Sequence, residues 1–184
     1  INAAINNLGC KHIISSPLEH HATLHTVEHV SKHCNVKLSY VKVKADGHID
    51  LEDLENIIKN SKERCLVTLM HANNEIGTIM PIREIGAIAR KHGVLFHTDA
   101  VQAAGHIPID VKADNIDLLT LTAHKFHGPK GTGAVYIKQG VKIGSLVYGG
   151  GQEKGIRAGT ENTAGILGLG LAAVHAKENM KENS

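Results

Sequence analysis

The sequence is poor in the residue types that mark several functional classes of protein. Tryptophan is absent, aromatic residues make up 3% of the chain, and the net charge is only +2 with histidine neutral. No basic run is interleaved with aromatic side chains, so neither nucleic acid nor an anionic membrane is expected as a partner. The longest apolar stretch, 164–174, is far short of the roughly 20 residues that a membrane-spanning helix needs.

Cysteine is scarce as well. The chain has three cysteines, Cys10, Cys34 and Cys65, and no Cys-x-x-Cys pair. An odd number of widely spaced cysteines argues against a disulfide framework, so a reducing, cytoplasmic location is expected. We interpret all three as small, partly buried hydrophobic residues rather than nucleophiles.

The remaining composition is that of an ordinary globular domain. Hydrophobic residues make up 42% and charged residues 21% of the 184 residues, enough for one domain with a real core. The opening residues, INAAINNLG, lack an initiator methionine and read as part of a helix that ends at Gly9. We therefore expect the chain to be a piece of a longer protein.

Apolar strands and amphipathic helices alternate along the sequence. Strands are predicted at 11–15, 36–43, 65–72, 94–99, 116–123 and 133–138. Helices are predicted at 20–33, 51–60, 81–92 and 161–180, with Asp50 and Asp53 as N-cap residues and Pro81 at the first helical position. Strands that are almost continuously apolar and alternate with helices predict one α/β domain, a three-layer arrangement in which helices flank a mostly parallel sheet.

Polar side chains follow three of the predicted strands. Asn74 comes after strand 65–72, Asp99 and Gln102 lie at and beyond the end of 94–99, and Lys125 follows 116–123. Ligands of open α/β sheets bind outside the carboxyl ends of the strands. Each residue alone also fits a helix cap or a solvated loop, but the three strand ends together predict a ligand site.

The side chains at these ends suit pyridoxal phosphate. That cofactor needs a lysine for a Schiff base and a carboxylate at the pyridine nitrogen. Lys125 can supply the first, because a lysine near other polar groups at a desolvated rim loses its proton readily. Asp99 can supply the second, and Asn74 and Gln102 can donate hydrogen bonds to the ring oxygen.

The residues on either side of the lysine complete this prediction. Residues two apart in a strand share a face, so Thr122 at the end of the predicted strand and His124 just beyond it can point together at a phosphate. Gly128 and Gly131 keep the following chain close and flexible.

Four stretches in the same order along the chain resemble the cysteine desulfurases. These are fold-type I pyridoxal phosphate enzymes, grouped with the class V aminotransferases and related to the selenocysteine lyases. The resemblance covers essentially the whole chain, and the stretches that carry it are HANNEIG (71–77), HTDAVQ (97–102), TAHKFHGPKGTGAVYI (122–137) and GGGQEKGIRAGTEN (149–162).

The resemblance implies a role for each residue of the ring site. Lys125 matches the lysine that forms the Schiff base, and Asp99 matches the partner of the pyridinium nitrogen. Asn74 and Gln102 match the residues around the ring hydroxyl. His20, in PLEHHAT, matches the histidine that stacks on the ring and takes part in proton transfer.

The phosphate contacts are implied in the same way. Thr122 occupies a position where many relatives have serine on the phosphate, and His124 is its neighbour in that role. Thr160, in RAGTEN, matches the threonine that reaches the phosphate of the neighbouring subunit, which implies a homodimer. On local pattern alone, His20 reads as a helix-start residue and Thr160 as the N-cap of the last helix.

The implied reaction converts L-cysteine to L-alanine and leaves the sulfur as an enzyme-bound persulfide. By resemblance, the sulfur acceptors include iron–sulfur scaffold proteins. A selenocysteine lyase, or another β-eliminating relative, is the alternative within the enzyme class.

Some family features have no counterpart in these residues. The family's Gly-x-Thr-Glu phosphate turn lies before a helix like INAAINNLG, and its persulfide-forming cysteine loop and carboxylate-binding arginine lie after a helix like 161–180. We therefore expect residues 1–184 to form a single large cofactor-binding domain, truncated at both ends and without the small C-terminal domain.

Two non-enzymatic alternatives remain open. His21, His25, His29 and His33 recur at intervals of four, which aligns imidazoles on one face of a helix and suits a transition-metal-binding module. A solvated helix face is the ordinary interpretation of that pattern. The chain can also be a folded but inactive remnant without cofactor.

Overall fold

The structure, a computed structural model, describes residues 1–180 and is built on one six-stranded sheet. The strand order is β2-β1-β3-β4-β5-β6, in which β6 alone runs antiparallel to its neighbour. The strands are β1 (His12–Ser15), β2 (Lys37–Tyr40), β3 (Cys65–Thr68), β4 (Leu95–Asp99), β5 (Leu118–Thr122) and β6 (Gly133–Ile137). The predicted α/β class with a mostly parallel sheet is confirmed.

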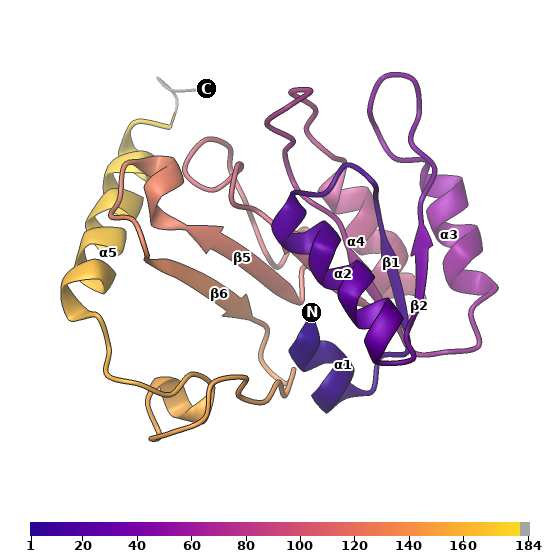
Figure 1. Cartoon of the computed structure of the whole chain (residues 1–184). Helices are drawn as coiled ribbons and strands as arrows, with labels where there is room; N and C mark the ends of the chain where they lie inside the picture. Colours follow the sequence, from indigo (N-terminus) through magenta and orange to yellow (C-terminus); the bar gives the residue numbers. More distant parts are fainter. Residues whose placement is uncertain (181–184) are drawn as a thin grey trace.

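Helices cover both faces of this sheet. The α-helices are α1 (Asn2–Leu8), α2 (His21–His33), α3 (Leu51–Lys59), α4 (Ile82–Lys91) and α5 (Thr163–Glu178), and the 3-10 turns are η1 (Ala123–Phe126) and η2 (Glu153–Gly155). Figure 1 shows α1 and α2 on one side of the sheet and α3 and α4 on the other. This gives the predicted three layers.

The alternation of side chains along β1 explains why two layers of helices are needed. Ile13 packs with Val27 and Val30 of α2, whereas Ile14 belongs to the cluster that contains Leu54 of α3. Successive residues of a strand point to opposite faces, so an apolar strand must be covered on both.

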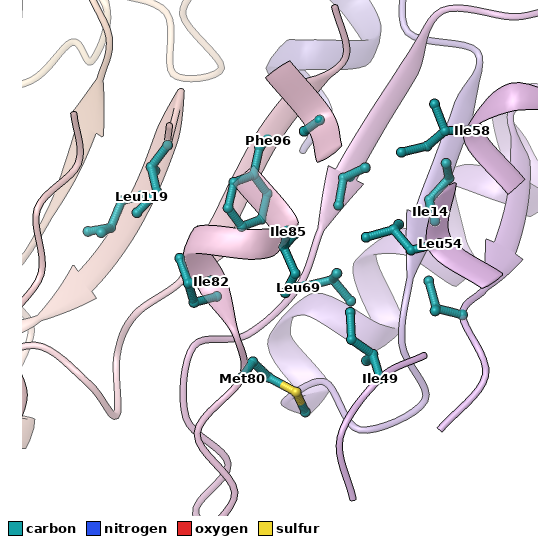
Figure 2. Packing of buried hydrophobic residues seen from close by; sticks show 14 of the residues in the cluster. Ile14, Ile49, Leu54, Ile58, Leu69, Met80, Ile82, Ile85, Phe96 and Leu119 are labelled. Atoms are coloured by element: carbon teal, nitrogen blue, oxygen red, sulfur yellow. The ribbon is translucent and has the colours of Figure 1, made fainter. Parts of the chain in front are cut away.

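The main core lies between the sheet and the pair α3 and α4. Figure 2 shows side chains of Leu54, Ile85 and Phe96 directed into this cluster, and all three are fully buried. Truncation of a buried phenylalanine such as Phe96 to alanine typically lowers the free energy of unfolding by about 3–5 kcal/mol. This layer therefore contributes much of the stability of the domain.

Three local predictions about helix starts are corrected in detail. Asp50 is the N-cap of α3 and accepts hydrogen bonds from Glu52 and Asp53, but the Asp53 carboxylate instead accepts from the backbone of Lys42. Pro81 is the N-cap of α4 rather than its first helical residue.

The last helix also begins later than predicted. Asn162, whose Oδ1 accepts from the backbone N–H of Gly165, caps α5, so Thr160 is not its N-cap. Asn162 is the cap because its amide oxygen lies three residues before a backbone N–H group that has no acceptor within the helix.

The antiparallel strand β6 is fixed to β4 and β5 by a buried carboxylate. Asp117 accepts a hydrogen bond from the backbone N–H of Phe96 at 3.1 Å and from Lys138 Nζ at 2.7 Å. Gly133 is required at the other end, because a Cβ there would lie 2.6 Å from the carbonyl oxygen of Leu121. Among residues 1–180, no helix is long and apolar enough to cross a membrane.

A buried histidine joins the three central strands just below their carboxyl ends. His97 of β4 lies 2.8 Å through Nδ1 from Thr68 Oγ1 of β3, and 3.4 Å through Nε2 from Thr120 Oγ1 of β5. Burial lowers the pKa of His97 from its ordinary value of 6.5 to about 3. The ring is therefore neutral, and both of its nitrogens serve the hydrogen bonds between strands.

This neutral histidine predicts a loss of stability in acid. The unfolded chain takes up a proton at His97 below pH 6.5 and the folded chain does not, so unfolding becomes easier as the pH falls towards 3. Between pH 7 and pH 4.5 this site should remove roughly 2–3 kcal/mol from the free energy of unfolding. Urea titrations at the two pH values should show a smaller decrease in His97→Gln than in wild type.

The exposed His175→Gln variant, which alters a ring on the surface of α5, serves as the control. It should show the wild-type decrease. Equal decreases in wild type and His97→Gln would contradict a neutral buried ring.

Candidate functional site

The register of the parallel strands brings three of the predicted site segments to one rim of the sheet. Asp99 at the end of β4 is paired with Thr120 of β5, and its carbonyl accepts a hydrogen bond at 2.9 Å from the backbone N–H of His71, just beyond β3. The chain then continues from His71 to Asn74, and from Thr120 to Lys125. The predicted convergence at the carboxyl ends of the strands is therefore found.

Lys125 is presented by a 3-10 turn rather than by the strand itself. β5 ends at Thr122, and in the turn η1 that follows Ala123 and Phe126 are buried while His124 and Lys125 are exposed. The carbonyl of Lys125 accepts a hydrogen bond from His106 Nε2 at 2.9 Å. The turn thus fixes the backbone of the lysine and leaves its side chain exposed to solvent.

The chain beyond the lysine folds back tightly, as the HGPKG sequence requires. His127 adopts a left-handed conformation with φ of 65°, and Gly128 donates to the Ala123 carbonyl at 2.8 Å. A Cβ on Gly128 would lie 2.7 Å from the Ala123 side chain, so only glycine fits. Gly131 has φ of +75°, which glycine adopts without strain.

Thr122 and His124 meet as predicted, although the reason differs. The Thr122 hydroxyl lies 3.0 Å from His124 Nδ1 and also donates to the Thr132 carbonyl at 3.2 Å. His124 lies in η1, so the two-residue alternation of a strand does not bring them together; the turn does. The pair forms a polar edge, half-buried at Thr122 and exposed at His124.

Asp99 is held in place by its own loop. Its Oδ1 accepts a hydrogen bond from the backbone N–H of Val101 at 3.0 Å, and the residue is half-buried. Gln102 lies in the same turn and is also half-buried. A carboxylate fixed in this way at the end of a strand suits a cationic partner that approaches from the rim.

The remaining predicted residues lie in three different loops. His20 is the N-cap of α2 and accepts from the Ala22 N–H at 3.1 Å, so its predicted role as a helix-start residue is confirmed while its ring stays exposed. Asn74 is exposed and donates to Glu75 Oε1 at 2.8 Å. Thr160 is exposed in the loop before α5 and makes no hydrogen bond to the other predicted residues within 1–180.

Two buried residues of the site were missed from sequence. Glu19 accepts a hydrogen bond from the backbone N–H of Met70 at 2.8 Å, and Asn73 donates to the Leu18 carbonyl at 2.8 Å. Each directly precedes a predicted site residue, in the doublets Glu-His and Asn-Asn. For Asn73, a polar doublet after a buried strand is a signal that could have found it, whereas Glu19 lies in the loop before α2 and has no such signal.

The donor set fits pyridoxal phosphate. An exposed amine, a fixed carboxylate and a hydroxyl–imidazole pair lie at the ends of neighbouring strands, where the cofactor needs an imine, a partner for its ring nitrogen and phosphate ligands. Together, the sheet and this set are typical of the fold-type I pyridoxal phosphate enzymes.

The chain belongs to the class V aminotransferase family, whose sequence profile matches residues 1–184. It is 56% identical over 173 residues to the cysteine desulfurase IscS of Clostridium botulinum, a match that covers 94% of this chain and 43% of that protein.

Solved structures show the same likeness. A NifS-like protein matches with a TM-score of 0.90 and 41% identity, over 97% of this chain and 48% of its own. A structure of SspA in complex with cysteine matches with a TM-score of 0.87 and 39% identity, over 95% and 52% of the two chains. The chain spans less than half the length of the curated relative.

None of the three cysteines of this chain lies beside the predicted site. Cys10 and Cys65 are buried, and burial raises the pKa of both thiols. Cys34 is exposed, so the expectation that it is partly buried is wrong; it follows the last residue of α2 and lies about 20 Å along the helix axis from His20. Their interpretation as residues other than the nucleophile is consistent with these positions.

The histidine ladder of α2 forms two pairs of rings. His21 and His25 stack with ring centroids 4.8 Å apart, and His29 and His33 lie 4.5 Å apart with tilted planes. Across residues 1–180, no group of three or more histidine, cysteine or acidic side chains is placed to hold a metal ion. Two imidazoles alone make an incomplete set for zinc, which takes four ligands in structural sites.

The zinc alternative is open to a direct test. Isothermal titration of the chain with zinc should show only weak, non-stoichiometric binding, because each pair supplies two ligands. His25→Ala, which breaks one pair, should leave the isotherm nearly unchanged. Tight binding of one zinc ion that is lost in His25→Ala would instead establish a metal-binding module.

Proposed function

We propose that this chain carries the cofactor-binding part of a pyridoxal phosphate-dependent cysteine desulfurase that acts on L-cysteine. The observation that carries the proposal is the convergence of Lys125, Asp99 and the Thr122–His124 pair at one rim of the sheet. The 56% identity to a cysteine desulfurase and the likeness to SspA, solved in complex with cysteine, support the choice of substrate.

The proposed reaction transfers sulfur. The carbon–sulfur bond of L-cysteine breaks, and the sulfur atom passes to an enzyme thiol, which becomes a persulfide. The carbon skeleton gains a proton at Cβ and leaves as L-alanine, so the atoms balance without an added oxidant or reductant. We assign none of Cys10, Cys34 and Cys65 as the accepting thiol.

Each residue at the rim has one task in this proposal. Pyridoxal phosphate, when bound, supplies an electron sink for the substrate carbon. The Lys125 amine holds the cofactor and then, with His20, moves the proton of the substrate α-carbon. Asp99, whose Oδ1 is held by the Val101 N–H, keeps a proton on the ring nitrogen.

Four further residues hold the cofactor in this proposal. Thr122 and His124 bind the phosphate through their exposed polar edge, and Asn74 and Gln102 bind the ring oxygen. Because η1 fixes the Lys125 backbone through His106, the lysine side chain starts from one position relative to these residues.

The assembly of the protein is part of the same proposal. Thr160 lies in an exposed loop, where it is free to reach a second subunit, and we propose that it completes the phosphate site of a partner in a homodimer. We further propose that residues 1–184 act as one cofactor-binding domain in the cytoplasm, and that the persulfide passes to acceptors such as iron–sulfur scaffold proteins.

The amine of Lys125 is tested by absorbance. The polypeptide as encoded, incubated with pyridoxal phosphate and freed of excess, should be yellow because an imine to lysine absorbs visible light. Lys125→Ala should lose this band, and Lys130→Ala, which removes an exposed lysine from the same turn, should keep it. A wild-type protein that stays colourless would favour the inactive remnant.

The carboxylate of Asp99 is tested by turnover. Asp99→Asn keeps the size of the side chain but cannot hold the ring nitrogen protonated, so alanine formation from L-cysteine should fall by roughly 10²-fold or more. Asp46→Asn, which changes an exposed aspartate far from Asp99 in the sequence, is the control. Full activity in Asp99→Asn would overturn the assignment, and alanine formed from L-selenocysteine alone would identify a selenocysteine lyase.

A further inference from the structure

Glu19 is a buried carboxyl group at the edge of the candidate site. The residue is only 5% exposed, although it directly precedes the exposed His20. Its Oε1 accepts a hydrogen bond at 2.8 Å from the backbone N–H of Met70, just beyond the end of β3. Its Oε2 is also buried and has no hydrogen-bond partner among the described residues.

A second buried side chain binds the same two loops together. Asn73 Nδ2 donates to the Leu18 carbonyl at 2.8 Å, while Asn73 Oδ1 accepts from the backbone N–H groups of Glu75 and Ile76. The loop before α2 and the loop after β3 are therefore fastened at two points. Each fastening residue directly precedes an exposed side chain that we assign to the cofactor, because Glu19 precedes His20 and Asn73 precedes Asn74.

The charge state of Glu19 follows from these surroundings. Burial raises the pKa of the Glu19 carboxyl from 4.5 to about 8, the Met70 N–H opposes the rise, and the negative charge of Asp99 adds to it. Among the described groups, Asp99 of β4 is the charge that acts on Glu19, and the loop after β3 contributes only the backbone donor of Met70. No described cation offsets an ionised Glu19.

We propose that Glu19 is a positioning residue of this site, a neutral carboxylic acid that fastens the His20 loop to the end of β3. The proton resides on Oε2, because Oε1 already accepts from Met70. An ionised carboxylate in this place would be desolvated with a single hydrogen bond, which is strongly unfavourable. The inference rests on the proposed function for its link to the cofactor.

The neutral state of Glu19 also matters for Asp99. Two ionised carboxylates close together would repel, and one of them would then take up a proton. A neutral Glu19 places no second negative charge beside the Asp99 carboxyl group, which we assign to a cationic ring nitrogen. Glu19 therefore positions His20 through its loop and adds no competing charge to the site.

The protonation of Glu19 is tested without any ligand. The folded chain keeps this proton up to about pH 8 while the unfolded chain releases it above pH 4.5, so stability falls as pH rises between these values. Glu19→Gln mimics the neutral acid and does not titrate. Its thermal midpoint should rise relative to wild type by roughly 5–10 °C between pH 5.5 and pH 8.5.

Two further variants sharpen this comparison. Glu84→Gln, an exposed change in the first turn of α4, should follow wild type at both pH values. Glu19→Ala leaves the Met70 N–H without its acceptor and should melt below Glu19→Gln at both. If the thermal midpoints of wild type and Glu19→Gln changed by the same amount across this pH range, the claim that Glu19 is neutral would be overturned.

The positioning role is tested by cofactor binding at pH 7. Titration with pyridoxal phosphate should give Glu19→Gln a dissociation constant within about threefold of wild type, because the amide keeps the contact to Met70. Glu19→Ala should bind roughly tenfold more weakly or worse, because the His20 loop is released. Wild-type affinity in a folded Glu19→Ala, or no rescue by glutamine, would overturn the role.

Two results distinguish a failure of this inference from a failure of the proposed function. A wild-type chain that binds no pyridoxal phosphate would overturn both the proposed function and the positioning role. The thermal comparison, which needs no ligand, would still decide whether Glu19 is neutral.

Discussion

The candidate site depends above all on the parallel register of β3, β4 and β5. Residues far apart in the sequence meet because Asp99 pairs with Thr120 and accepts a hydrogen bond from the backbone of His71. His97 secures this register from below, since its neutral ring joins threonines of the two neighbouring strands. If one of these strands slipped by one residue, its side chains would turn to the opposite face and the site would not form.

In the loops at this rim, buried residues lie directly beside the exposed residues of the candidate site. In η1 the buried Ala123 and Phe126 enclose the exposed His124 and Lys125. In the loop before α2 the buried Glu19 precedes the exposed residue that caps the helix. This arrangement lets reactive side chains reach the solvent while a packed residue beside each of them limits its motion, which is what a binding site requires of its supporting shell.

Much of the fold could be predicted because hydrophobic periodicity is a local signal. The strand 65–72 and its neighbours were recognised from continuous apolar runs, and the polar residues at their ends marked the rim. Glu19 and Asn73 could not be found in this way, since their hydrogen-bond partners lie 51 and 55 residues away in the sequence. The switch from β5 to η1 could not be predicted either, because Thr122 and His124 fit the alternation of a strand, whereas the close approach of Gly128 to Ala123 is a property of the folded turn.

The central claim is that this rim holds pyridoxal phosphate through Lys125. The most direct measurement is reduction of the loaded protein with borohydride, which converts an imine to a stable amine, followed by proteolysis and mass spectrometry of the peptides. We predict a phosphopyridoxyl group on Lys125 in a single labelled peptide. A label on another lysine, such as the nearby Lys130, or no label in a protein that has bound the cofactor, would contradict it.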